Sequence, residues 1–200
     1  MLASVPINRA ARQLQDTGAT RWTAAVLLDY CNEAIRKIVS AKPEQHRTRA
    51  TRQLTAALSS QSVPTGCIAY FGPKRNMGSD GTTAGAVIRG PVDREALDAF
   101  TANWMTTPST TIKEWTQVSP FEPTFLVNPP VHGTTAVYVE EEYTPEPTTL
   151  TASSDTLPVS ADHEAAIVEW ILGRSYGEET EEGSVLRSET CFKRFWEMMA

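Results

Sequence analysis

The chain is poor in the residues that build disulfide scaffolds and metal sites. It has three cysteines and three histidines in 200 residues, and Cys31, Cys67 and Cys191 contain no CxxC pair. This odd, widely spaced set predicts reduced thiols rather than a disulfide framework. No run approaches the roughly 20 apolar residues of a transmembrane helix, and residues 1–20 lack the apolar core of a signal peptide. We therefore expect a protein made in the cytoplasm, with no membrane partner.

An excess of positive charge is also missing. The chain carries 18 Lys and Arg against 24 Asp and Glu, a formal net charge of −6. Non-specific binding to nucleic acids depends on neutralising phosphates with Lys and Arg, so this balance argues against DNA binding by the whole surface and leaves room only for a local basic patch. The hydrophobic content of 40% is ordinary for a globular protein, and the length suits one domain or one domain with an insertion.

A complete catalytic set is absent as well. Residues 173–177 match GxSxG, the nucleophile elbow of α/β-hydrolases, but all three histidines precede Ser175 and the serine lies in a helical pattern. A partial HExxH string begins at His163 and has isoleucine in place of the second histidine. The glycines between 72 and 90 form neither phosphate-binding motif, GxxxxGK[ST] or GxGxxG. We therefore predict no enzymatic activity, no cofactor and no metal.

The clearest helical periodicity lies in residues 22–42, where apolar residues recur at i, i+3, i+4 and i+7. Thr20 is expected to cap this helix and Pro43 to end it. Val26 and Tyr30 form a second apolar strip. This strip predicts a helix that packs on several sides and lies at the centre of a helical bundle. The main strip consists of Ala24, Leu27, Leu28, Cys31, Ala34, Ile35, Ile38 and Val39.

The remaining patterns predict an α+β fold, in which N- and C-terminal helices form a bundle with a small antiparallel β insertion. We expect the divisions 1–62, 63–158 and 159–200, with 144–158 as an exposed, linker-like loop. Leu97 and Phe100 are expected to face inward from helical turns at 93–100. Further helices are predicted at 6–14, 45–60, 163–178 and 184–199, and strands at 66–71, 84–88, 111–118, 124–126 and 135–143.

Basic side chains gather in the segment 36–52 and again at Lys74 and Arg75. They form either a solvated face or an electrostatic seam against an acidic neighbour or passing DNA. The acidic runs 140–142 and 178–182 would supply such a neighbour from another copy in a head-to-tail ring. The candidates for partner contact in these two places are Arg47, Arg49, Arg52, Lys74 and Arg75.

The last predicted helix is rich in aromatic residues and ends in two methionines. Such residues serve either as core or as an apolar plug for a partner. Phe195 and Trp196 suit the first role and the methionines the second, and both roles remain open for Trp196. The candidates for partner contact here are Phe195, Trp196, Met198 and Met199.

Several short motifs follow one another along the chain and include Arg21-Trp22-Thr23, Val63-Pro64-Thr65-Gly66, Arg75-Asn76-Met77-Gly78, Phe125-Leu126-Val127 and residues 171–176. Taken in order, these motifs resemble the head-to-tail adaptor, or connector, proteins of short-tailed bacteriophages. The resemblance implies a virion structural protein in the neck between head and tail, made in the host cytoplasm. It implies a ring of about twelve copies under the portal protein, which extends the DNA channel and attaches the tail proteins, with genomic DNA passing unrecognised.

Two other classes compete with this interpretation. One is a nucleic-acid-binding assembly protein that uses the basic segment 36–52. The other is a hydrolase with Ser175 as its nucleophile.

Overall fold

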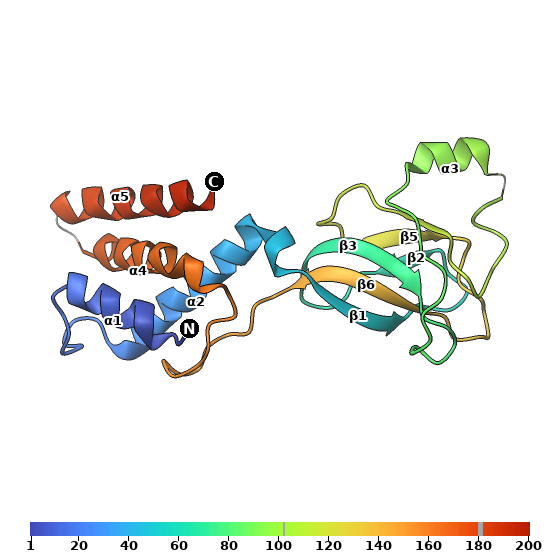
Figure 1. Ribbon diagram of the computed structural model, residues 1–200. Helices are drawn as coiled ribbons and strands as arrows, with labels where there is room; N and C mark the ends of the chain where they lie inside the picture. Colours follow the sequence, from blue (N-terminus) through green and yellow to red (C-terminus); the bar gives the residue numbers. More distant parts are fainter. Residues whose placement is uncertain (102, 180–181) are drawn as a thin grey trace. The chain divides into compact units, whose positions relative to one another are not determined.

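The computed structural model describes residues 1–101, 103–179 and 182–200. The chain divides into two compact units (Figure 1). The helical unit comprises Met1–His46 and Glu146–Ala200, and the β unit comprises Arg47–Pro145. The β unit is thus an insertion between two parts of a helical bundle, which confirms the predicted α+β class. None of the helices in the described ranges is both long and apolar enough to cross a bilayer.

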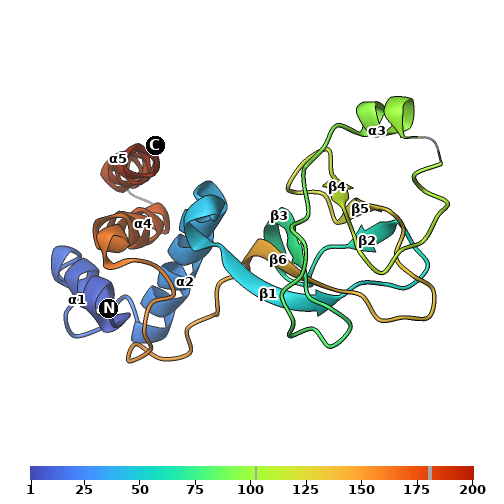
Figure 2. The ribbon, with the colours of Figure 1, turned by 45° about the vertical axis from the view of Figure 1, so that its right-hand side comes forward.

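The helical unit is built around α4, Glu164–Gly177, rather than around α2 as predicted. In Figures 1 and 2, α4 lies between α5, Glu182–Met199, on one side and α1, Ser4–Gln13, and α2, Ala24–Ala41, on the other. A helix that contacts neighbours on several sides must be apolar nearly all round. The buried positions of α4 accordingly include Ala166, Ile167, Val168, Trp170, Ile171, Leu172, Gly173 and Ser175.

The start of α2 also differs from the prediction. Its cap is Thr23, whose hydroxyl accepts a hydrogen bond from the Val26 amide at 3.4 Å, and not Thr20. The amide of Thr20 instead donates to the Asp16 carboxylate at 2.8 Å, as the amides of the next two residues do. These hydrogen bonds hold the pKa of Asp16 below its ordinary value, the Trp22 amide contributing most. Asp16 therefore organises the turn between α1 and α2.

The GxSxG motif packs helices rather than forming a nucleophile elbow. Ser175 is fully buried within α4. A Cβ atom at Gly173 would lie 2.9 Å from the Phe192 ring of α5, and the Gly173 carbonyl accepts a hydrogen bond from the Ser188 hydroxyl at 2.7 Å. The small residues therefore allow α4 and α5 to approach closely, which removes the structural basis for the hydrolase interpretation.

The segment after residue 145 is packed against the helical unit and is not the exposed loop that we expected. Leu150 and Leu157 are buried. The side-chain amide of the buried Asn32 on α2 exchanges two hydrogen bonds with the Leu150 backbone, at 3.0 and 2.8 Å. This pairing fixes the segment to α2.

The β unit contains two antiparallel sheets, with strand orders β1-β6-β3 and β2-β5-β4. Its core includes Tyr70, Trp115 and Phe125, whose rings lie 4.7–6.4 Å apart. Gly72, at φ +89°, lets the backbone approach this cluster, because a Cβ atom there would lie 2.0 Å from the Trp115 ring. The strands are β1 Thr48–Gln53, β2 Ser60–Ser62, β3 Cys67–Asn76, β4 Glu114–Thr116, β5 Thr124–Asn128 and β6 Tyr138–Pro145.

The prediction of a helix at residues 45–60 is wrong. These residues form the 3-10 turn Pro43–His46, then β1 and the start of β2, so residues 47–62 lie in the β unit. The strand expected at 84–88 makes only an isolated bridge, between Arg75 and Val87. Helical turns after Asp93 are confirmed as α3, Arg94–Phe100, with Asp93 as its cap. Leu97 of α3 is buried as expected, but Phe100 is 88% exposed.

Candidate functional site

The sheet β1-β6-β3 brings together the basic residues predicted for partner contact. Arg49 and Arg52 lie on β1, and Arg47 immediately precedes this strand. Lys74 and Arg75 lie on β3. Between these two strands runs β6, which carries the acidic run 140–142. Cations from both edges therefore meet carboxylates on the middle strand.

On one face of the sheet, three cations share the carboxylate of Glu142. Its oxygens lie 3.4 Å from Arg47 Nη1, 3.3 Å from Arg49 Nε and 3.5 Å from Lys74 Nζ. Burial alone would raise the pKa of Glu142, but the Lys74 charge and the Arg49 hydrogen bond lower it below its ordinary value. Three cations against one carboxylate leave this cluster with a net charge of +2. We call Arg47, Arg49, Lys74 and Glu142 the cationic cluster.

On the opposite face, Arg52 is held within the protein. Its guanidinium donates two hydrogen bonds to Glu141, at 2.7 and 2.9 Å, and the Tyr70 hydroxyl donates a third at 3.0 Å. Glu141 is 1% exposed. Burial alone would lower the pKa of Arg52, but the hydrogen bonds and charge of Glu141 raise it above its ordinary value. Arg52 therefore stabilises the β unit, and its charge is not available to a partner.

The acidic runs expected to serve another copy are also engaged within the chain. Glu141 and Glu142 bind cations of their own sheet, and Glu140 lies opposite Arg75 in the register of β6 and β3. In the second run, Glu178 accepts a hydrogen bond from the Tyr30 hydroxyl and Glu179 lies 3.0 Å from Arg21. Thr180 and Glu181 lie outside the described residues. Glu141, Glu142, Glu178 and Glu179 are therefore bound within the chain and are not free acidic partners for another copy.

A cleft opens beside the cationic cluster. The Arg47 guanidinium stacks on the Phe71 ring, with Cζ 3.9 Å from the ring centroid. The cavity has a volume of about 340 Å³. Its lining combines two cations with an apolar floor and includes Arg47, Phe71, Lys74, Trp115, Val118 and Pro120. This surface, the Arg47 cleft, suits a ligand group that joins an apolar side chain to a negative charge.

Only half of the C-terminal candidates are accessible. Phe195 and Met199 are buried, with 0% and 7% of their surface exposed, because they face α4 together with Ser184, Ser188 and Cys191. Trp196 and Met198 are 49% and 45% exposed. Trp196 and Met198 are therefore the two C-terminal candidates whose side chains are exposed, whereas Phe195 and Met199 belong to the core.

The basic segment 36–52 is divided between the two units. Arg36 and Lys37 of α2 line a groove of the helical unit, about 560 Å³ in volume, which also contains Trp170 and Phe192. Arg52 is neutralised by Glu141 in the β unit. No group of His, Cys, Asp or Glu in the described part of the chain is arranged to hold a metal ion.

Two histidines of the helical unit form a pair that sequence reasoning did not single out. The rings of His46 and His163 lie 6.2 Å apart, and His46 Nε2 is buried with no hydrogen-bond partner among the described residues. Burial and the charge of His163 lower the pKa of His46, against the raising effect of Glu44. Burial and Lys42 lower that of His163, against Asp162.

The histidine pair predicts a stability that decreases in acid. Both pKa values lie below the ordinary 6.5 in the folded state, so unfolding takes up protons once the pH falls below about 6.5. The free energy of unfolding should therefore decline between about pH 7.5 and pH 5.5. Denaturant titrations across this range should show a flatter profile for His46→Gln/His163→Gln. An equal slope in both proteins would contradict the assignment.

Comparison with protein families decides the identity. The profile of the SU10 adaptor proteins matches residues 3–198, nearly the whole chain. The chain belongs to the SU10 adaptor protein family. This places it among the structural adaptor proteins of bacteriophages and in the neck of the virion, as the resemblance of its motifs implied. A comparison with curated proteins gave no match.

Proposed function

We propose that this adaptor forms a ring of about twelve copies beneath the portal protein, extends the DNA channel and provides the surface to which the tail attaches. The family match over residues 3–198 is the observation that carries this proposal. The insertion of a β unit into a helical bundle supports it, because two compact units offer separate surfaces to different partners.

The helical unit offers α5 as the contact for the portal protein. Four large apolar side chains of this helix are partly exposed, each between 45% and 62%: Val185, Leu186, Trp196 and Met198. Exposed apolar residues that share one helix mark an interaction surface, and partly exposed tryptophan is enriched among interface anchors. We infer that Trp196 and Met198 bury their side chains against the portal protein.

In this proposal, genomic DNA passes through the channel of the ring and the protein does not recognise its sequence. The net charge of −6 disfavours general binding, and the pairing of Arg52 with Glu141 removes one cation of the basic segment. We therefore place nucleic-acid-binding assembly second to the adaptor role.

Native mass spectrometry of the protein with and without the portal ring of its phage tests the function. We expect a portal complex that carries about a dozen copies. Trp196→Ala/Met198→Ala should weaken portal binding at least about tenfold, because it removes apolar anchors without disturbing the core. The matched control is Val5→Ala, which trims a residue of α1 with 42% exposure in the same unit. A protein that ignores the portal would overturn the proposal, and unchanged binding by the double variant would remove α5 from it.

A further inference from the structure

Helix α3 of the β unit displays an unusually exposed aromatic side chain. Phe100, its last residue, is 88% exposed. Both Figure 1 and Figure 2 show α3 standing away from the two sheets. An aromatic side chain in this position is available as an anchor for a partner, because aromatic residues are enriched in protein interfaces.

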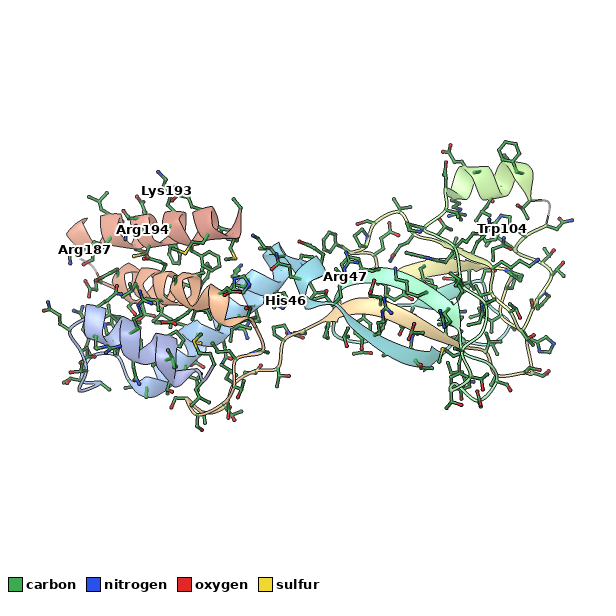
Figure 3. All side chains as sticks on the ribbon, viewed as in Figure 1. His46, Arg47, Trp104, Arg187, Lys193 and Arg194 are labelled. Carbon is green, nitrogen blue, oxygen red and sulfur yellow. The ribbon has the colours of Figure 1, made fainter. Side chains whose placement is uncertain are left out.

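The helix nevertheless has a fixed position. Leu97 is 6% exposed and serves as its apolar anchor. The Trp104 indole, beside α3 in Figure 3, donates a hydrogen bond from Nε1 to the Asp98 carboxylate at 2.8 Å. These two contacts fix the position of α3, the helix that carries Phe100. Less conformational entropy is therefore lost when Phe100 binds a partner.

The surroundings of Phe100 are acidic. The cap and body of α3 contain Asp93, Glu95 and Asp98 against the single cation Arg94, a net charge of −2. This charge is equal and opposite to that of the cationic cluster beside the Arg47 cleft. The cleft, at about 340 Å³, has room for one aromatic side chain on its apolar floor.

We propose that Phe100 of one copy inserts into the Arg47 cleft of the next copy, with the carboxylates of α3 facing Arg47 and Lys74. The contact specifies how neighbouring copies join in the ring and to that extent rests on the proposed function. It uses different surfaces on the two copies, so it is heterologous. Such a contact forms a ring when the rotation between neighbouring copies closes.

Phe100 does not occupy the Arg47 cleft of its own copy. Pro91 lines the cleft and lies only three residues before α3 begins. From there the seven-residue helix carries Phe100 about 10 Å away from its first residue. Phe100 is not part of the cleft lining and is 88% exposed, so its ring does not fill the cleft of its own copy.

Self-association of the isolated protein is the first test. Sedimentation velocity over a range of concentrations should show Phe100→Ser weakening the contact between copies about thirtyfold, as expected for loss of an aromatic anchor. Val87→Ser is the matched control: Val87 is 65% exposed in the same unit but lies outside α3 and the cleft, so its loss should leave association within about twofold. Circular dichroism should be the same for both variants.

Cross-linking between two variants tests the geometry. Ala99→Cys, at an exposed position of α3 next to Phe100, keeps the aromatic anchor. Ala99→Cys and Val118→Cys proteins, mixed and treated with a short bismaleimide, should give a linked pair of one copy of each. The wild-type protein, with its native Cys31, Cys67 and Cys191, and each variant alone should give none. The reaction is repeated with the portal ring present, so that copies held together only on the portal are also sampled.

The outcomes separate this inference from the proposed function. A portal complex of about a dozen copies in which Ala99→Cys and Val118→Cys do not cross-link would overturn the contact and leave the adaptor role intact. Cross-linking of copies that do not bind the portal would support the contact and overturn that role. Absence of cross-linking both with and without the portal overturns the contact.

Discussion

Replacement of Glu141 by leucine should lower the free energy of unfolding by about 3–5 kcal/mol. The Arg52 guanidinium and the Tyr70 hydroxyl both donate to this carboxylate, which is 1% exposed. Without it, the buried Tyr70 hydroxyl remains desolvated and unpaired, and the partly buried Arg52 guanidinium loses the carboxylate that compensates its charge. Denaturant titration followed by tryptophan fluorescence measures the effect, because Trp115 belongs to the same core.

The neighbouring glutamate is the control for this experiment. Glu142 binds its three cations on the other face of the sheet, where exposed ion pairs contribute only about 0–1 kcal/mol. Glu142→Leu should therefore cost far less than Glu141→Leu. Removing the donors as well, in Arg52→Met/Tyr70→Phe/Glu141→Leu, should recover most of the lost stability. Equal costs for the two single variants would show that the buried network does not hold the β unit together.

Truncation of Phe195 to alanine should destabilise the helical unit by about 3–5 kcal/mol. Its side chain is fully buried, and its ring centroid lies 4.8 Å from that of Trp170 on α4. Since α5 packs chiefly on α4, few other contacts compensate for the cavity. Thermal and denaturant unfolding followed by circular dichroism should register the loss as an early transition of the helices.

The adjacent Trp196 provides the comparison. It is 49% exposed, so Trp196→Ala should change stability by about 1 kcal/mol or less, while the same substitution contributes to the loss of portal binding described above. Phe195→Ala and Trp196→Ala thus separate a core residue from an interface residue one position apart. Similar destabilisation by both would place Trp196 in the core and remove it from the proposed portal contact.

Local periodicity was sufficient for most of the helices. The 3.6-residue spacing in α2, α4 and α5 predicted their positions, because burial against any apolar surface requires the same stripe. Which helix lies at the centre could not be predicted in this way. The central place of α4 depends on which helices pack against it, and those contacts join residues far apart in the sequence.

Residues 45–60 show how a local pattern can mislead. Their apolar residues fit a helical face, yet residues 48–53 also alternate between partly buried and exposed positions, as an edge strand does. The ladder with β6 decides the conformation, since it pairs Thr48 with Tyr143 and Gln53 with Tyr138. A strand partner about 90 residues away leaves no mark within the segment itself.

By itself, the sequence determined the α+β class, the membership of a phage adaptor family and the positions of the charged and aromatic residues. Only the tertiary structure decided what those residues do. On a helix, Arg49 and Arg52 would share one face, but on a strand successive side chains alternate, so residues three apart face opposite sides. Arg49 therefore joins the cationic cluster at the surface and Arg52 binds the buried Glu141. The pairing with β6, a non-local interaction, separates the interface candidate from the residue that stabilises the fold.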